Sequence, residues 1–184
     1  MKVSVYIAVS MDGFIARENG DLDWLPGIEG FAGESEYEED YGYNAFIESV
    51  DVIVMGRSTF EKVMHFDPWP YKNKRLIVLS SSLSTIPGNV PDTVELLNKT
   101  PEKILELLEH QKVKHVYLDG GRTIQSFLNA GLVDELIVTR IPVLIGQGIP
   151  LFGRLKKDIQ LQHFETAAYK NGLVQSCYHV KNQD

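Results

Sequence analysis

The chain has 184 residues, of which 43% are hydrophobic, and this is enough apolar material for one globular core. Its formal net charge of −7 disfavours a nucleic-acid-binding surface, because phosphate groups would approach against the overall field. One cysteine excludes an intrachain disulfide and the five histidines lack zinc-type spacing, so we expect a single cytoplasmic domain over residues 1–184 without metal, membrane segment or nucleic-acid partner.

The N-terminal half begins with a predicted strand over residues 3–9, where apolar side chains alternate with less apolar ones. Residues 11–13 end in Asp-Gly and predict a turn. The segment 19–33 is rich in Gly, Asp and Pro, which is typical of a long surface loop that carries function. A helix is predicted over residues 34–50, because its acidic start suits the positive end of the helix dipole. Its expected buried stripe comprises Tyr37, Tyr41, Ala45 and Phe46.

Three continuous apolar runs in the middle of the chain predict parallel strands that are buried on both faces. They cover residues 51–56, 76–79 and 116–118. Before the third run, Thr100 is the predicted N-cap of a helix with Pro101 at its first position. A second short helix is expected over residues 123–130, with Gly131 directly after its end.

The C-terminal third is richer in strands, with predicted strands at residues 135–144, 159–169 and 173–180. Asn171 and Gly172 lie between the last two, and this dipeptide is a strong hairpin signal. The whole pattern predicts an α/β fold, in which helices flank a mixed, mostly parallel central sheet and an antiparallel hairpin forms the C-terminal edge.

Three polar segments directly follow predicted strands and are candidates for phosphate binding. Residues 56–59 read Gly-Arg-Ser-Thr, where a helix N-terminus attracts phosphate and Arg57 adds a planar fork of donors. Residues 120–123 read Gly-Gly-Arg-Thr, where two missing Cβ atoms let a pyrophosphate approach the backbone. Ser80 and Ser81 follow another strand. Each segment alone is more typical of a plain turn, but ligands of open α/β sheets bind beyond the carboxyl ends of strands, where all three lie.

Four segments, at residues 10–16, 55–61, 120–121 and 142–152, occur in the order found in one protein family. By them the chain resembles the dihydrofolate-reductase-like superfamily, and most closely the branch related to the reductase domain of riboflavin biosynthesis. The resemblance implies a mixed eight-stranded sheet, an NADPH cofactor and a homodimer. We expect the strand-rich C-terminal third to supply the dimer interface, since it holds more apolar side chains than one sheet edge readily buries.

The resemblance also implies a function and roles for individual residues. The function is hydride transfer from NADPH to a small substrate, expected to be cyclic and pterin- or pyrimidine-like. Arg57 is expected near the 2′-phosphate of NADPH. The other implied cofactor residues are Gly56, Ser58 and Thr59 beside Arg57, Ser80 and Ser81 at the adenosine, Gly120, Gly121, Arg122 and Thr123 at the pyrophosphate, and Ala8 and Ile15 at the nicotinamide.

The substrate side leaves alternatives open. Dihydrofolate reductases place a carboxylate soon after a tryptophan that resembles Trp24, and Glu29 has about that spacing. The catalytic proton comes from Glu29, from Asp12 or through water, although Asp12 beside a glycine is more typical of a turn. Trp24 either covers a flat substrate ring or fills the core. The alternative functions are a non-catalytic nucleotide-binding module of the same fold and a genuine dihydrofolate reductase.

Overall fold

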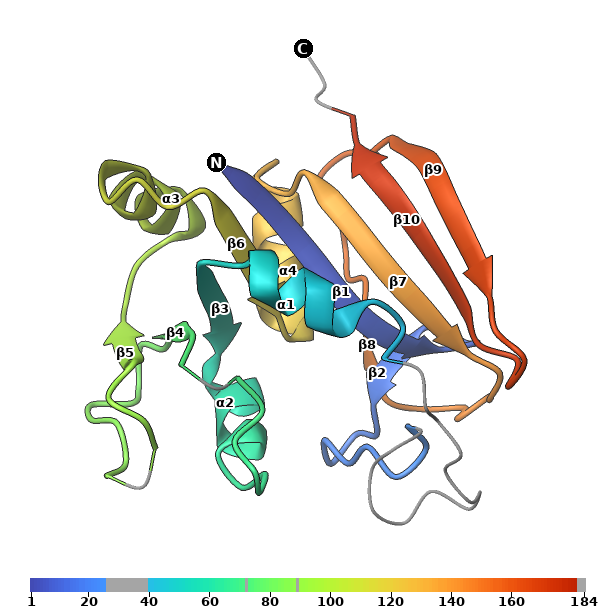
Figure 1. Cartoon of the computed structure of the whole chain (residues 1–184), viewed down its shortest axis with the longest axis horizontal. Helices are drawn as coiled ribbons and strands as arrows, with labels where there is room; N and C mark the ends of the chain where they lie inside the picture. The colour runs from blue at the N-terminus through green and yellow to red at the C-terminus, as the bar shows by residue number, and fades with distance from the viewer. Residues whose placement is uncertain (26–39, 72, 89, 182–184) are drawn as a thin grey trace.

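The computed structural model describes residues 1–25, 40–71, 73–88 and 90–181. Within these residues eight strands form one sheet, with bounds β1 (Lys2–Ser10), β3 (Val52–Gly56), β4 (Arg75–Leu79), β5 (Val94–Leu97), β6 (His115–Asp119), β7 (Glu135–Ile141), β9 (Leu161–Ala168) and β10 (Val174–Val180). Their order across the sheet is β5-β4-β3-β6-β1-β7-β10-β9. Neighbours from β5 to β7 are parallel, and β10 lies antiparallel to both β7 and β9 (Figure 1). The predicted fold class is therefore confirmed.

Helices cover both faces of this sheet. They are α1 (Tyr43–Ser49), α2 (Arg57–Val63), α3 (Pro101–His110) and α4 (Gly121–Asn129). In Figure 1, α1 crosses in front of the sheet and α4 lies behind it, while α2 lies at the edge toward which the parallel strands point. A small ribbon of β2 (Phe14–Ala16) and β8 (Ile149–Pro150) lies at that same edge. None of the helices in the described ranges is long and apolar enough to cross a membrane.

The strand interiors divide their side chains between two core clusters, as alternation requires. Val116 and Leu118 of β6 belong to the cluster that includes Ile124 and Phe127 of α4. Tyr117, between them, belongs to the cluster that includes Phe46 of α1. We call the two sides of the sheet the α4 face and the α1 face. Any residue at a strand end is therefore assigned to a face by its place in the alternation.

Several predicted elements differ in detail from the structure. The helix predicted over residues 34–50 begins only at Tyr43, because Tyr41 and Gly42 have positive φ of 55° and 85° and form a turn. Residues 34–39, including Tyr37, lie outside the described residues. Within the helix, Phe46 is buried but Ala45 is exposed, so the predicted stripe was partly wrong.

Other differences concern element ends and short strands. The strand predicted to reach residue 144 ends at Ile141, because Pro142 has no N–H to donate to a neighbouring strand. Helix α4 begins at Gly121, two residues earlier than predicted. The four-residue strand β5 and the ribbon of β2 and β8 were not predicted, because such short segments show too little alternation to be distinguished from loop.

Candidate functional site

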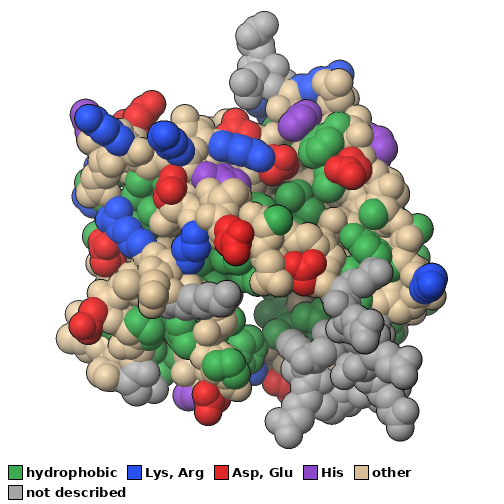
Figure 2. Space-filling model, viewed as in Figure 1, with side chains coloured by type: hydrophobic (Ala, Val, Ile, Leu, Met, Phe, Trp, Pro, Cys, Tyr) green, Lys and Arg blue, Asp and Glu red, His purple; other side chains and the backbone are tan. Residues whose placement is uncertain are grey.

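A cleft of about 1210 Å³ lies beyond the carboxyl ends of β3, β4 and β6 and beside β1. In the space-filling view, a hollow that contains hydrophobic side chains opens beside α2 (Figure 2). The cleft is lined by every residue that was predicted to bind cofactor: Ala8, Ile15, Gly56, Arg57, Ser58, Thr59, Ser80, Ser81, Gly120, Gly121, Arg122 and Thr123. Parallel strands bring their carboxyl ends to one edge, so segments that are distant in sequence meet here.

The two glycine-containing segments interlock at the centre of the cleft. Gly120 has φ 85°, and a Cβ at this position would overlap the hydroxyl of Thr59. A Cβ at Gly56 would lie 3.1 Å from the hydroxyl oxygen of Thr123. The absence of both side chains therefore lets the N-termini of α2 and α4 lie close together. Free N–H groups at the start of α4 and its dipole make this point favourable for a pyrophosphate.

Arg57 is held at the outer end of the cleft by two hydrogen bonds. Its Nε donates to Glu61 at 2.6 Å and its Nη1 donates to the hydroxyl of Ser82 at 3.0 Å. Ser80 shapes the same loop, because its hydroxyl accepts hydrogen bonds from the backbone N–H groups of Ser82 and Leu83. The guanidinium is thus already placed beside the serine loop, where a phosphate monoester on a ribose would find both.

A carboxyl group that was not predicted as a site residue lies deeper in the cleft. Asp119 is the last residue of β6. It lies two residues after Tyr117, so its side chain is on the same α1 face of the sheet. The hydroxyl of Tyr71 donates to Asp119 Oδ2 at 2.9 Å, although 48 residues separate the two in sequence. Burial raises the pKa of Asp119, and the hydrogen bonds from Tyr71 and from the Gly120 backbone oppose that rise. The available sequence signal was an acidic residue at the end of an apolar strand, directly before the glycine pair.

The Asp12 carboxylate, which was predicted as a possible proton donor, is bonded within the protein. Its carboxylate accepts a hydrogen bond from the Ser10 hydroxyl at 2.6 Å and from the backbone N–H groups of Ile145 and Gly146. These bonds, with Ser10 contributing most, hold the pKa of Asp12 below its ordinary value, so the group stays ionised. Asp12 is also not part of the cleft wall. In the structure Asp12 is thus a brace between two loops, and its role as proton donor stays a prediction.

The two remaining substrate-side candidates have different outcomes. Trp24 is only 3% exposed and packs against Ile141 and Leu173, so of its two predicted roles the structure favours filling the core over covering a substrate. It is likewise absent from the cleft wall, whereas its neighbours Leu22 and Leu25 line it. Glu29 lies outside the described residues, and the structure does not place its side chain.

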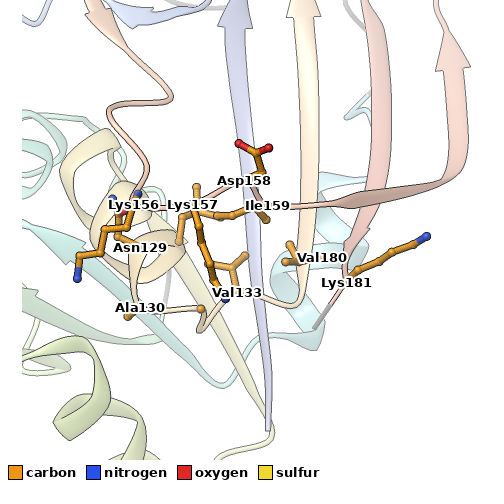
Figure 3. Close-up of a pocket in the computed structure, with 11 residues that line it drawn as sticks. Asn129, Ala130, Val133, Lys156, Lys157, Asp158, Ile159, Val180 and Lys181 are labelled. Atoms are coloured by element: carbon orange, nitrogen blue, oxygen red, sulfur yellow. Dashed lines mark hydrogen bonds between the residues drawn. The ribbon is translucent and has the colours of Figure 1, made fainter. Parts of the chain in front are cut away.

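A second pocket, of about 370 Å³, lies at the opposite end of α4 (Figure 3). Its floor includes Val133, Ile159 and Val180, and the side chain of Lys157 extends across it in Figure 3. Asn129 fixes the loop beside it, because its Nδ2 donates to the Arg154 carbonyl and its Oδ1 accepts from the backbone N–H of Lys156. None of the predicted site residues lines this pocket, so the larger cleft is the candidate site. Among the described residues, no three His, Cys, Asp or Glu side chains gather as a metal site would require.

Comparisons with known proteins agree with this geometry. The model of the RibD C-terminal domain family matches residues 1–175. YwjB, an uncharacterised protein of Bacillus subtilis, is 37% identical over 164 residues, which cover 88% of each chain. A crystal structure from Shewanella sp. PV-4, of a protein named for riboflavin biosynthesis, is 38% identical with a TM-score of 0.90 and covers 99% of this chain and 100% of its own.

The likeness also extends to a more distant fold relative. Dihydrofolate reductase from Enterococcus faecalis, solved with NADP(H) and RAB-propyl, has a TM-score of 0.65 at 21% identity. The aligned region covers 98% of this chain and 97% of that one. At this identity the likeness concerns the fold alone, and it agrees with the predicted dihydrofolate-reductase-like sheet.

Proposed function

The chain belongs to the RibD C-terminal domain family, and we propose that it is an NADPH-dependent reductase that transfers hydride to a small cyclic substrate. The family and the reductase-type fold support this proposal. The observation that carries it is the convergence of three phosphate-type segments and a partly buried carboxyl group in one cleft. Fold alone does not define an activity, so the argument depends on the residues of that cleft.

The cleft residues fit NADPH part by part. The interlocked glycines bring the starts of α2 and α4 together in the cleft wall, where the free backbone N–H groups at the start of α4 would hold a pyrophosphate. Arg57 and the serine loop would hold the 2′-phosphate. Ala8 and Ile15, at the β1 end of the cleft, offer apolar contacts to the nicotinamide. NADPH supplies the hydride, and the protein orients the reactants and excludes water.

Asp119 is the group that we propose to hold the catalytic proton. It lies in the cleft wall, whereas Asp12 does not. Because burial raises its pKa, its carboxyl group keeps a proton more readily than an exposed aspartate does. Tyr71 orients the carboxyl through the bond to Oδ2 and leaves the rest of the group available to a substrate.

The test is NADPH oxidation, followed by the absorbance of reduced nicotinamide, across a panel of pterins, pyrimidines, imines and quinones. A reductase oxidises NADPH with at least one class, and Asp119→Asn lowers kcat while the Kd for NADPH stays unchanged. NADPH binding without turnover on any class would favour the non-catalytic nucleotide-binding module. Methotrexate-sensitive turnover of dihydrofolate would instead identify a genuine dihydrofolate reductase.

We also propose that the chain forms a homodimer through its C-terminal third. Leu144 is 71% exposed, and Phe152, Leu161 and Phe164 are exposed as well, which leaves apolar surface on β9 and in the segments that follow β7 and β8. Ile141 and Leu151, two other apolar side chains of this C-terminal third, are buried in the chain itself. Sedimentation at micromolar concentration tests this, and a mass near 20.8 kDa with or without NADPH would contradict it.

A further inference from the structure

The small ribbon of β2 and β8 forms one wall of the cleft. Ile15 and Ala16 of β2 and Ile149 of β8 all line it. The two strands pair antiparallel, with Phe14 opposite Pro150 and Ala16 opposite Ile149. They are only three and two residues long, and so short a ribbon makes few backbone hydrogen bonds of its own. Its position therefore depends on the contacts that hold it to the rest of the protein.

The ribbon packs directly on the first residue of α4. A Cβ at Gly121 would lie 3.0 Å from Ile15 Cδ1 and 3.3 Å from the Pro150 carbonyl oxygen. Both distances are tighter than a methyl group normally accepts, so the missing side chain at Gly121 lets the ribbon approach the helix. The apolar wall around Ile15 consequently adjoins the helix start that would hold a pyrophosphate.

Gln125 joins α4 to the ribbon by its side-chain amide. Its Nε2 donates to the carbonyl oxygen of Pro150 at 3.1 Å and to that of Leu151 at 3.2 Å. An amide nitrogen carries two N–H donors, so one group can serve both carbonyls. Gln125 follows Gly121 by one helical turn, and helix side chains lean toward the N-terminus. The amide nitrogen thus lies 3.8 Å from the position that a Cβ of Gly121 would take.

The remaining contacts hold the inner end of the ribbon. Leu151 is 1% exposed and belongs to the core cluster that contains Ile124 of α4. Its backbone N–H donates to the Gly13 carbonyl at 3.0 Å. Ile149, which faces the cleft, is 36% exposed. Core packing therefore fixes the ribbon where it leaves the cleft, and the cleft-facing part depends more on the amide bonds from α4.

Asn129, one turn further along α4, offers an internal comparison. Its amide bonds to the Arg154 carbonyl at 3.1 Å, and its side-chain oxygen accepts from the Lys156 N–H. It lines the smaller pocket of Figure 3 and not the cleft. Gln125 and Asn129 thus tie the same segment of chain to the same helix, one beside the cleft and the other at the far end. A purely structural contribution would be common to both amides.

Resting on the proposed reductase function, we propose that Gln125 is a positioning residue for the nicotinamide end of NADPH. Gln125 is not part of the cleft wall and acts through the ribbon. Its amide holds the two β8-side carbonyls, and this fixes the wall that presents Ile15 and Ile149 to the nicotinamide ring. Arg57 and the serine loop, at the adenosine end, do not depend on this bond.

The experiment is titration calorimetry with NADPH and with adenosine 2′,5′-bisphosphate, which carries the 2′-phosphate but no nicotinamide. Gln125→Met keeps an unbranched side chain of similar length and removes the donor. It should raise the Kd for NADPH by about five-fold or more, as expected for two lost neutral hydrogen bonds, and leave the Kd for the bisphosphate unchanged. The matched control is Asn129→Leu, which removes the far amide and should leave both Kd values unchanged.

A second measurement uses the unaltered protein and does not depend on the folding of a variant. Hydrogen exchange at the backbone N–H groups of β2 and of Leu151 should slow when NADPH binds, because the nicotinamide would rest on the ribbon. Adenosine 2′,5′-bisphosphate at saturation should leave the same exchange rates unchanged.

The outcomes separate this inference from the proposed function. Equal weakening of both ligands in Gln125→Met, or unchanged NADPH binding in that variant, would overturn the positioning role and leave the reductase proposal intact. A loss of NADPH affinity of the same size in Asn129→Leu would also overturn it, since the effect would not belong to the cleft end of α4. Equal protection of the ribbon by the two ligands would do the same. Failure of the unaltered protein to bind NADPH would instead remove the proposed function, on which the inference rests.

Discussion

Replacing Arg57 by alanine should weaken NADPH binding and leave NADH binding nearly unchanged. Arg57 is the basic side chain held beside the serine loop, and only NADPH carries the 2′-phosphate that it would contact. A charge-assisted hydrogen bond is worth about 1.5–3 kcal/mol. At 1.4 kcal/mol for each factor of ten, this corresponds to a Kd for NADPH that is higher by roughly 10- to 150-fold.

Stability should change little in the same variant. The Arg57 side chain is 47% exposed, and its ion pair with Glu61 joins residues one helical turn apart, which contributes only about 0.3–0.5 kcal/mol. Thermal unfolding without ligand should therefore resemble that of the unaltered protein. The control is Glu61→Gln, which removes the pair but keeps the guanidinium, and it should bind NADPH at least as well.

Titration calorimetry with both cofactors decides the matter. A loss of similar size for NADPH and NADH in Arg57→Ala would show that the residue acts on a part common to both molecules. That result would refute the assignment of Arg57 to the 2′-phosphate, and it would leave the pyrophosphate assignment at the start of α4 unaffected.

Three further changes test the structure around the site. Gly120→Ala should lower the free energy of unfolding, measured with denaturant, by about 1–3 kcal/mol, because φ of Gly120 is 85° and the new methyl group meets Thr59. A variant as stable as its parent would contradict the interlock of Thr59 with Gly120. Trp24→Phe should cost about 1–2 kcal/mol and leave NADPH affinity unchanged, whereas a change confined to substrate KM would return Trp24 to the site. Hydrogen bonds from backbone N–H groups, of which the one from Lys114 contributes most, hold the pKa of Asp51 below its ordinary value. The ionised Asp51 carboxylate therefore stabilises the fold at pH above its ordinary pKa, and this contribution is lost as the pH falls through its lowered pKa in the folded protein. Asp51→Asn should thus lower Tm at neutral pH and match the parent in strong acid; an equal difference at every pH would exclude this cause.

The sequence predicted best what depends on local pattern. The run at 51–56 became β3 with its side chains buried on both faces, because an unbroken apolar stretch fits only the interior of a parallel sheet. Thr100 caps α3 as its side-chain chemistry required. The residues that were predicted to bind cofactor meet in one cleft, because strand direction brings their segments to one edge of the sheet.

Contacts between distant loops escaped prediction. The bond from Tyr71 to Asp119 depends on the path of the segment before β4, and nothing in either neighbourhood specifies it. From the sequence, Asp12 is either a turn residue or a catalytic acid. Its hydrogen-bond donors at residues 145–146 lie more than 130 positions later in the chain, so the sequence near Asp12 does not indicate them. Side chains of this kind acquire their roles from tertiary structure, and neither propensity nor periodicity encodes them.

The interlock of Thr59 with Gly120 also restricts how this protein could be re-engineered or could diverge. A larger residue at position 120 would meet Thr59 and would also carry the strain of φ 85°, so a smaller residue at position 59 relieves only the first cost and position 120 should stay glycine. Arg57 and Ser82 stand outside that constraint, at an open rim where their substitution disturbs no packing. On the proposed function, a change of cofactor preference toward NADH would be sought at those rim positions, while Thr59 and Gly120 stay unchanged.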